Sequence, residues 1–476
     1  MDSNFYKVMS PAYRELWNDD LQARIDDGIE NNRKADGVFA VGAAPGTEVR
    51  AEMLRHGFIF GAHIFNFNQL GTDERNEKYK ALYGTLFNSA TTAFYWQPFE
   101  PEQGHMRFET TEIDTAEFWN SCKDPKLQFH WRRPSTDQIV DFCEEKHIRC
   151  HGHPLVWGNR TWHYPRWVMD RLPKDVLVQL MTDLLCGTNV WSKSPDEIDR
   201  LLPGFADFYT EAIEKRIKAI AERYGDRIQS YDVCNESATD FEMGRLIPGD
   251  RLCKSVYYLM PGDYTFLAFQ LARKYLPESV KLNINDYHLV DAYREQTLDL
   301  MRRGCKIDIQ GAQMHLFDPQ LCLDIAEGAP NAAQKPLDVI KTMKRIDAGL
   351  PIHLSEITIT APGNDARGQA IQAAITRNLY RLWFSIKPMM GITWWNVVDD
   401  CGAPGEPSVS GLFSRNMDPK PAFHVLDELV NHEWKTDTTV KADAEGRVSF
   451  RGFRGTYRLS WTGADGKPVS REVMLK

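Results

Sequence analysis

The stretch IQSYDVCNE, residues 228–236, is a mainly apolar run that ends in an amide, Asn235, and a carboxylate, Glu236. A second stretch, IHLSEITIT at residues 352–360, carries Glu356 in similar surroundings. Short apolar runs of this length predict buried strands. A strand end holds a side chain rigidly and the following loop shapes a cleft, so both carboxylates are candidates for chemistry.

Working outward from these two stretches, six further apolar runs alternate with helical patterns along the chain. They are FIFGAHIF (58–65), TLFNSATTAFYW (85–96), HIRCHGHPLVW (147–157), VKLNIND (280–286), IDIQGAQMH (307–315) and GITWWNV (391–397). Eight strands separated by helices predict an α/β fold, a (β/α)8 TIM barrel. The polar groups at the strand ends would then converge on one cleft.

Both ends of the chain differ in texture from this central part. Residues 431–476 alternate short strand patterns with glycine turns, and residues 33–56 contain similar short strands. The predicted domains are therefore 1–56, an N-terminal lead with accessory strands, 57–430, the catalytic barrel, and 431–476, a C-terminal β module. We expect the two terminal segments to form one small β-sandwich-like module together.

Composition narrows the class of protein. The chain has 476 residues, 42% of them hydrophobic, and a net charge of −9, with no run of clustered Lys and Arg. This argues against a nucleic acid partner. No apolar stretch approaches the roughly 18 residues of a membrane span. No secretory signal is visible, and nine cysteines without framework spacing favour free thiols and a reducing compartment.

Paired carboxylates are the machinery of glycosidic bond hydrolysis. One carboxyl group holds a proton for the departing sugar oxygen, while the other stays ionised to attack the anomeric carbon or to activate water. Glu236 and Glu356 have the right side chains and the right predicted positions for these two roles. This chemistry needs no cofactor and no metal, and its partner is a carbohydrate substrate.

The strand-end residues resemble, in order along the chain, the elements of glycoside hydrolase family 10, the (β/α)8 retaining endo-β-1,4-xylanases. The resemblance covers about residues 58–430. Its elements are GHPLVW (152–157), YDVCNE (231–236), NDY (285–287), QMH (313–315), SE (355–356) and WNVVD (395–399).

This resemblance implies that Glu236 is the acid/base, that Glu356 is the nucleophile, and that the sugar's anomeric configuration is retained. Asn235 would bind the sugar 2-hydroxyl, an interaction that strengthens in the transition state. Gln313 and His315 lie two residues apart, hence on one strand face, and would orient Glu356. The expected substrate-binding residues are His153, Trp157, Asn235, Tyr287, Gln313, His315, Trp395 and Tyr95, with the tryptophans as flat walls for a sugar face.

Departures from the family pattern lie on the sugar-binding side. Thr92 and Tyr95 stand where the family has Asn and Lys, which usually hold the second sugar on the non-reducing side. Thr358 replaces an Asp that usually partners His315. The segment 401–411 has no Trp, although the family commonly has one there that crowds the sugar's C5 position. We therefore expect catalysis to be kept and sugar selection to be altered.

Two alternative functions remain open at this point. His151 and His153 form an HxH pair on one strand face, which in a (β/α)8 barrel can bind zinc in a metal-dependent hydrolase. A non-catalytic glycan-binding barrel is the second alternative, against which the presence of both glutamates argues.

Overall fold

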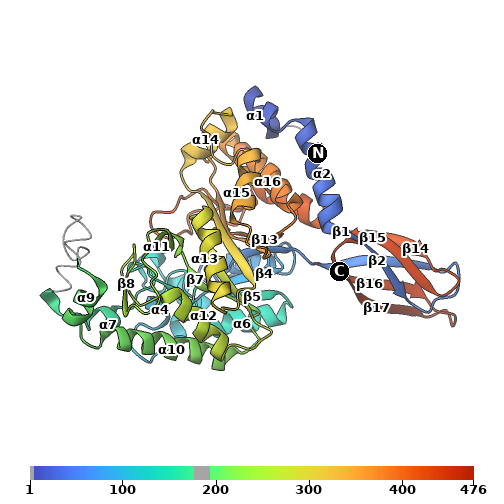
Figure 1. Ribbon diagram of the computed structural model, residues 1–476. Helices are drawn as coiled ribbons and strands as arrows, with labels where there is room; N and C mark the ends of the chain where they lie inside the picture. The colour runs from blue at the N-terminus through green and yellow to red at the C-terminus, as the bar shows by residue number, and fades with distance from the viewer. Residues whose placement is uncertain (1–4, 176–192) are drawn as a thin grey trace.

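The structure is a computed structural model that describes residues 5–175 and 193–476 (Figure 1). Its centre is a closed ring of eight parallel strands, in which each strand pairs with the next one and the last pairs with the first. In ring order they are β3 (Ile59–His63), β4 (Ser89–Ala93), β5 (Arg149–His153), β7 (Ser230–Asn235), β10 (Lys281–Asp286), β11 (Ile309–Leu316), β12 (Ile352–Ile359) and β13 (Met389–Trp394). The predicted (β/α)8 barrel is confirmed.

Helices connect the strands and cover the outside of the ring (Figure 1). The long connecting helices are α3 (Asp73–Ala81), α6 (Thr136–Glu145), α10 (Phe205–Tyr224), α12 (Tyr264–Tyr275), α13 (Asp291–Arg302), α14 (Pro319–Glu327), α15 (Pro336–Ile346) and α16 (Ala366–Ser385), and α17 (Pro421–Asp427) follows β13. Helix α10 shows why they form: Ile213, Ile217 and Ile220 are all buried on one face, and Gly225 stands at the C-terminal cap.

Shorter elements occupy the loops between strands. They are α4 (Trp96–Phe99), α5 (Ala116–Ser121), α7 (Arg166–Met169), α9 (Pro195–Leu201), α11 (Ala238–Glu242), the strand β6 (Val156–Trp157), and the hairpin of β8 (Leu252–Lys254) with β9 (Leu259–Pro261). Strand β6 pairs with β7 just beyond β5, which brings Trp157 beside Asn235. The loops at the carboxyl ends of the strands are thus the ones that build a site.

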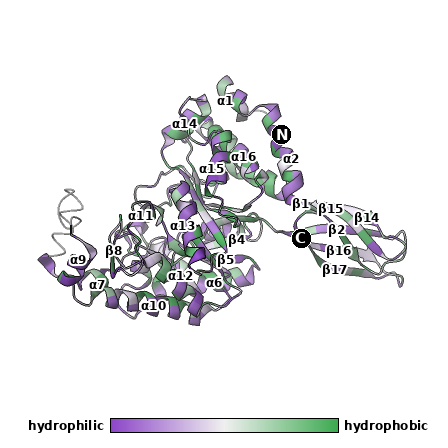
Figure 2. Cartoon of the chain, viewed as in Figure 1, coloured by the Kyte–Doolittle hydropathy of each residue, from purple (hydrophilic) through white to green (hydrophobic). Residues whose placement is uncertain are grey.

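The two ends of the chain meet in an antiparallel module that projects from the barrel (Figure 1). Strand β2 (Glu48–His56) lies between β14 (Asp437–Lys441) and β16 (Gly455–Thr462), which also pairs with β17 (Pro468–Leu475). Strand β1 (Lys34–Ala40) pairs with β15 (Arg447–Phe453). The prediction that N- and C-terminal segments form accessory sheets together is confirmed. The strands of the module carry both hydrophobic and hydrophilic residues (Figure 2), as expected of sheets with one buried face.

Helices α1 (Pro11–Leu16) and α2 (Asp19–Arg33) lead into this module, and α2 packs against α16 through a stripe of buried apolar residues, Leu21, Ile25 and Ile29. Arg33, at the end of α2, is 8% exposed and donates hydrogen bonds to the carbonyl oxygens of Phe384, Ile386 and Met389. Arg33 therefore ties the start of the module to the turn between α16 and β13.

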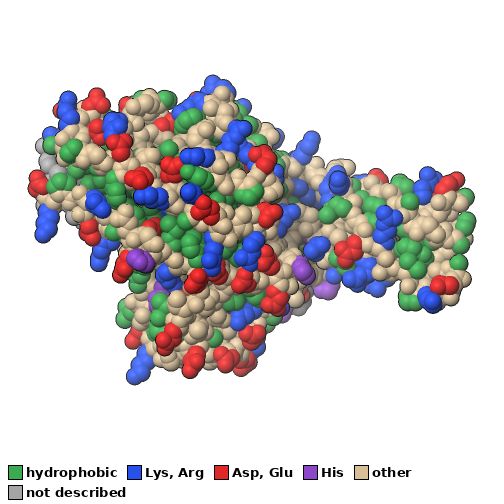
Figure 3. Space-filling model, turned by 90° about the horizontal axis from the view of Figure 1, so that it is seen from below, with side chains coloured by type: hydrophobic (Ala, Val, Ile, Leu, Met, Phe, Trp, Pro, Cys, Tyr) green, Lys and Arg blue, Asp and Glu red, His purple; other side chains and the backbone are tan. Residues whose placement is uncertain are grey.

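The surface shows Lys, Arg, Asp and Glu side chains interspersed over barrel and module on the face in Figure 3. Within the described part of the chain, no helix is long and apolar enough to cross a membrane. The cysteines of that part are all unpaired.

Arg216 on α10 positions the loops that follow β4 and β5. This side chain is 1% exposed and donates hydrogen bonds to the carbonyl oxygens of Phe94, Pro154 and Leu155. Its guanidinium also lies 5.2 Å from the centre of the Trp96 ring. These carbonyl groups lie close in the chain to Tyr95 and Trp157. One buried arginine therefore fixes the positions of both loops relative to each other.

We predict that Arg216→Met lowers the free energy of unfolding by about 3 kcal/mol or more, because buried carbonyl groups lose their only charged donor. Urea and thermal unfolding measure the change. The matched control is Lys215→Ala on the same helix, whose side chain is 66% exposed and should change stability by no more than about 0.5 kcal/mol. Equal losses in the two variants would contradict this role of Arg216.

Candidate active site

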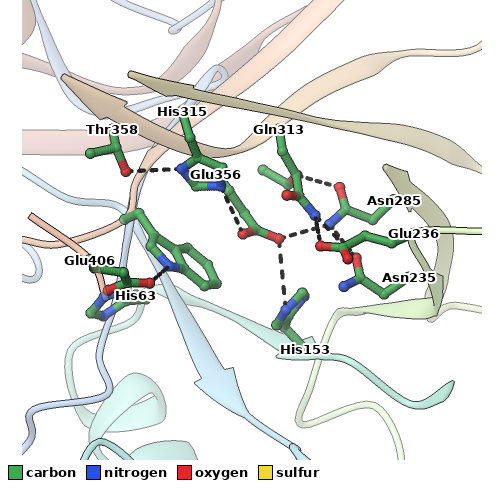
Figure 4. Close-up of polar contacts among 12 residues, drawn as sticks. His63, His153, Asn235, Glu236, Asn285, Gln313, His315, Glu356, Thr358 and Glu406 are labelled. Carbon is green, nitrogen blue, oxygen red and sulfur yellow. Dashed lines mark hydrogen bonds and ion pairs between the residues drawn. The ribbon is translucent and has the colours of Figure 1, made fainter. Parts of the chain in front are cut away.

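A cavity of about 660 Å³ opens at the carboxyl ends of the barrel strands. Every site residue predicted from the sequence lines it: Tyr95, His153, Trp157, Asn235, Glu236, Tyr287, Gln313, His315, Glu356 and Trp395. Figure 4 shows the carboxylates of Glu236 and Glu356 within one network of polar contacts. The barrel thus brings together residues that lie up to 300 positions apart in the chain.

Glu356, on β12, is the more buried carboxylate, at 5% exposure. Its Oε1 accepts a hydrogen bond from Asn285 Nδ2 at 2.9 Å and lies 3.7 Å from His153 Nε2. Its Oε2 lies 3.3 Å from His315 Nε2. Three side chains from three other strands therefore fix both oxygens of this carboxyl group.

Burial raises the pKa of Glu356 to about 8, and the negative charges of Glu236 and Asp232 add to the increase. His153 and the hydrogen bond from Asn285 act in the opposite direction. Glu356 therefore holds its proton at pH values well above those at which a glutamate usually ionises.

Glu236 follows β7 directly and is partly exposed. Its Oε2 accepts hydrogen bonds from Tyr257 Oη at 2.6 Å and Trp157 Nε1 at 3.0 Å, and its Oε1 accepts one from Gln313 Nε2 at 3.0 Å. The backbone of Glu236 adopts φ +55°, a left-handed conformation that is uncommon for a non-glycine residue. This turn at the strand end and three donors aim the carboxylate into the cavity.

Three amide side chains link the two carboxylates. Asn285 Nδ2 donates both to Glu356 and, at 2.8 Å, to Asn235 Oδ1, which also lies 3.4 Å from Gln313 Nε2 (Figure 4). Because the oxygen of Asn235 faces these two donors, its amide nitrogen is left to face the cavity. Asn235 thus has the orientation needed to donate to a bound hydroxyl.

One sequence-based interpretation is wrong in detail. Gln313 and His315 were both expected to orient Glu356, since they share a strand face. The structure places His315 against Glu356 but Gln313 against Glu236. The two positions are about 7 Å apart along β11. Glu356 comes from β12, which neighbours β11, whereas Glu236 follows β7, which lies on the other side of β11 beyond β10, so each side chain meets a different carboxylate.

The HxH pair on β5 is engaged by a buried aspartate. His151 Nε2 and His153 Nδ1 lie 3.0 and 2.8 Å from the same oxygen of Asp232, and Ser230 Oγ lies 2.8 Å from His151 Nδ1. Burial acts against ionisation of Asp232, yet the two histidines hold its pKa below the usual range. An ionised carboxylate only accepts hydrogen bonds, so each histidine turns an N–H toward it, and His153 keeps only Nε2 for the cavity.

This arrangement leaves His151 without a free nitrogen for a metal ion. Across residues 5–175 and 193–476, no group of three or more His, Cys, Asp or Glu side chains is placed to hold a metal. The geometry of the pair thus favours its use as a hydrogen-bonding unit that orients His153.

His315 has a hydroxyl partner where the family pattern has a carboxylate. Its Nδ1 lies 2.9 Å from Thr358 Oγ1, on the neighbouring strand β12. Burial lowers the pKa of His315 to about 4, so the imidazole is neutral near pH 7. The Thr358 hydroxyl can donate to Nδ1, which leaves Nε2–H to donate to Glu356.

Aromatic side chains form one wall of the cavity. Phe65, Tyr95, Trp157 and Trp395 make a cluster separate from the main core. The tryptophans do more than offer flat faces, because Trp157 donates to Glu236 and Trp395 Nε1 lies 3.3 Å from Glu406 Oε1. Thr92, on β4, is fully buried, and its hydroxyl has no hydrogen-bond partner within the part of the chain that is described.

Sequence reasoning missed several residues that contact the two carboxylates or line the cavity. Tyr257 donates to Glu236 but comes from the β8–β9 hairpin, where no strand pattern marks it. Asn285 was part of a quoted motif, yet its bridging position depends on three strands meeting. Arg132, Arg133 and Glu406 line the cavity from loops. Only the absence of Trp from residues 401–411 gave a signal in the sequence, and it gave no sign of Glu406.

Comparison with known proteins shows which family this barrel resembles. The family model described as Glycosyl hydrolase family 10 matches residues 51–429. An endo-1,4-beta-xylanase A from Halalkalibacterium halodurans is 30% identical over 206 residues, which are 41% of this chain and 45% of that protein. An endo-1,4-beta-xylanase 2 from Aureobasidium pullulans is 25% identical over 337 residues, 67% of this chain and 79% of that protein.

Solved structures show the same fold. The crystal structure of native xylanase 10B from Thermotoga maritima aligns with a TM-score of 0.53 at 20% identity, covering 79% of this chain and 96% of that one. Xylanase B from Clostridium stercorarium F9 aligns with a TM-score of 0.51 at 22% identity, covering 78% of this chain and 97% of that one.

We predict that Glu356→Gln stabilises the protein increasingly as pH rises from about 4 to about 8. An unfolded glutamate ionises near pH 4.3, whereas Glu356 keeps its proton to about pH 8. Ionisation therefore favours the unfolded chain across this window, by at most about 1.4 kcal/mol per pH unit, and glutamine removes the effect. Thermal unfolding of both proteins at pH 5 and pH 8.5 measures it.

The control for this comparison is Glu222→Gln, whose side chain is 67% exposed and should show no such trend. A constant or shrinking advantage of Glu356→Gln at higher pH would show that the pKa of Glu356 is not raised.

Proposed function

The chain belongs to glycosyl hydrolase family 10, and from that premise we propose that it hydrolyses β-glycosidic bonds of a plant-type polysaccharide or oligosaccharide with retention of configuration. Glu236 acts as the acid/base and Glu356 as the nucleophile. The relatives named above as endo-1,4-beta-xylanases point to a xylan-like backbone.

The observation that carries this proposal is that two carboxyl groups line one cavity but differ in burial and in hydrogen-bond partners. Glu356 is held on both oxygens and deeply buried, as a nucleophile that must attack one carbon atom needs to be. Glu236 is more exposed, as a group that exchanges protons first with the leaving group and then with water needs to be.

Burial favours a proton on Glu356, so the reaction starts from the form of the site in which that proton has passed to Glu236 and Glu356 is ionised. In the first step, the ionised Glu356 attacks the anomeric carbon while the Glu236 carboxyl gives its proton to the departing oxygen. The glycosidic bond breaks and a glycosyl ester forms on Glu356. In the second step, Glu236, now ionised, takes a proton from water, whose oxygen attacks the same carbon and releases Glu356. Two inversions give net retention, and both glutamates return to their starting states.

The surrounding side chains support charge development in these steps. The free amide nitrogen of Asn235 can donate to the sugar 2-hydroxyl, whose interaction strengthens as the ring becomes oxocarbenium-like. Tyr257 and Trp157 donate to the Glu236 carboxylate that forms when its proton leaves. Asn285 and His315 stabilise the ionised Glu356 on which attack depends.

We also propose that sugar selection differs from that of a xylanase. Thr92 is fully buried and does not line the cavity, and Tyr95 presents a ring where the resemblance implies an ammonium group. Ala403 and Glu406 line the cavity in the segment where the family commonly has Trp. Losing hydroxyl-binding donors weakens the fit to an unsubstituted xylose unit, while the missing Trp leaves room for a group on C5.

We predict that Glu356→Ala abolishes turnover of every substrate, because no glycosyl ester can form. Glu236→Ala should keep the first step with aryl glycosides whose leaving groups need no proton, such as dinitrophenyl glycosides, and lose it with poor leaving groups. A burst of released phenol followed by a slow steady state would mark the accumulated ester. Near-normal turnover by Glu356→Ala would refute its assignment as the nucleophile.

We predict weak activity on unbranched xylo-oligosaccharides, with kcat/KM below about 10⁴ M⁻¹s⁻¹, the lower end of the usual enzyme range. Oligosaccharides with a substituent on C5 or on a branch should be better substrates. Initial rates with product analysis by mass spectrometry measure both. Efficient turnover of linear xylo-oligosaccharides would overturn the altered-selectivity proposal and leave the two glutamate roles intact.

A further inference from the structure

Two consecutive arginines line the cavity, and their surroundings differ. Arg132 has φ +60°, and this left-handed turn lets the side chains of both Arg132 and Arg133 reach the same cavity. In an extended segment, consecutive side chains would point to opposite sides. The loop between β4 and α6 therefore delivers two positive charges to one wall.

Both terminal nitrogens of the Arg132 guanidinium have partners within the protein. Arg132 is 3% exposed, lies 3.3 Å from Glu406 Oε2, and donates to Asn396 Oδ1 at 3.0 Å. Glu406 in turn accepts from Trp395, from Asn396 and from the backbone N–H of Ala403. Burial acts to raise the pKa of Glu406, but Arg132 and these donors hold it below the usual range. The pair is an internal ion pair with no charge to spare.

Arg133 is not paired in this way. Its guanidinium stacks on the Tyr95 ring, 3.7 Å from the ring centre, and its Nη1 donates to the carbonyl oxygen of Arg132 at 2.8 Å. Within the described ranges, no carboxylate forms an ion pair with this guanidinium, and the charge of Glu406, which is paired with Arg132, acts on it only at longer range. Burial lowers the pKa of Arg133 to about 10, so it remains charged near neutral pH. A partly buried cation without a counter-ion is costly to retain unless a ligand supplies one.

The position of Arg133 places this charge on the sugar-binding wall. Tyr95, on which it stacks, contacts the rings of His153 and Trp157, with ring centres 5.5 and 5.9 Å away. His153 Nε2 in turn lies 3.7 Å from Glu356 Oε1. Tyr95 also occupies the position that the resemblance assigns to the second sugar on the non-reducing side. Arg133 is thus near the nucleophile but outside the group of residues that touch it.

We propose that Arg133 binds a carboxylate of the substrate, so that the enzyme selects an acidic sugar, a uronic acid, on the non-reducing side of the cleaved bond. The inference rests on the proposed function and specifies its substrate class. A planar guanidinium offers two parallel N–H donors that match a carboxylate, and the ring of Tyr95 pre-orients it. The room left by the missing Trp fits a carboxyl group on C5 as well as a hydroxymethyl group.

The carboxylate can come from two sources. It can belong to a uronic acid in the main chain, or to a uronic acid branch on a neutral main chain. Both present the same charged group to Arg133, and they differ in which ring carries it. The experiment therefore uses β-1,4-linked glucuronic acid oligosaccharides and xylo-oligosaccharides with a single glucuronic acid branch, side by side.

Each acidic oligosaccharide is compared with its own carboxyl-reduced form, which has a hydroxymethyl group in place of the carboxylate. For at least one source, the wild-type enzyme should have a kcat/KM about 10- to 100-fold higher for the acidic form, as charge-assisted hydrogen bonds imply. In Arg133→Gln this ratio should fall toward one. If the glucuronic acid oligosaccharide and its reduced form show the difference, the recognised carboxylate belongs to the main chain. If the branched oligosaccharide and its reduced form show it, the carboxylate belongs to the branch.

The matched control is Arg171→Gln. Arg171 also carries a guanidinium over an aromatic ring, 4.8 Å from the centre of Phe208, but it does not line the cavity. Its removal changes the net charge equally and should leave the ratio unchanged. A merely structural role of Arg133 would lower kcat/KM for acidic and reduced forms alike and keep the ratio, which would overturn the inference.

Binding gives a second measurement that does not need turnover. Calorimetry with the Glu356→Ala variant should show tighter binding of the acidic oligosaccharide than of its reduced form, and the Arg133→Gln change added to it should abolish the difference. Equal affinities for both forms, from both sources, would refute the inference. If the wild-type enzyme hydrolysed none of these sugars while Glu356→Ala still showed the preference, the proposed function would fail and the carboxylate site would stand.

Discussion

The parallel pairing of β13 with β3 closes the barrel, and every feature of the site depends on that closure. The backbones come close enough that a Cβ at Gly391 would lie 2.7 Å from the Cβ of Ile59 and 2.8 Å from the His353 ring. Glycine at this point lets the last strand join the first. Once the ring is closed, the carboxyl ends of eight strands face one space, and polar side chains far apart in the chain become neighbours.

This convergence places several largely buried ionisable groups close together. The cost of burying each of these groups is offset by its own hydrogen-bond partners. Asp232 receives two histidines, Glu236 receives a phenol, an indole and an amide, and Glu356 receives an amide and an imidazole. The amides of Asn235, Asn285 and Gln313 connect the last two sets. Differences between these surroundings give two chemically identical carboxyl groups different roles in the proposed reaction.

The charged groups on the sugar-binding wall of the cavity are arranged differently from those at the catalytic centre. Arg132 and Glu406 neutralise each other, and their contacts with Asn396 and Trp395 brace the loop after β13. Arg133 keeps its charge toward the cavity, supported by the Tyr95 ring. In the proposed enzyme, therefore, the centre is tuned for a reaction common to many β-glycosides, and the wall is tuned for the particular sugar.

The sequence by itself determined the barrel, the accessory sheets built from both chain ends, and the strand-end residues that line the cavity. It could do so because strand patterns are local, and because a polar residue at a strand end of a closed parallel barrel can only face the common mouth. The partner of each side chain was decided by the tertiary structure alone. Gln313 turned to Glu236, Tyr257 reached it from a hairpin, and Arg133 was left unpaired beside a paired Arg132. Hydrogen bonds and ion pairs depend on distances of a few tenths of an ångström between loops, which spacing along the chain does not encode.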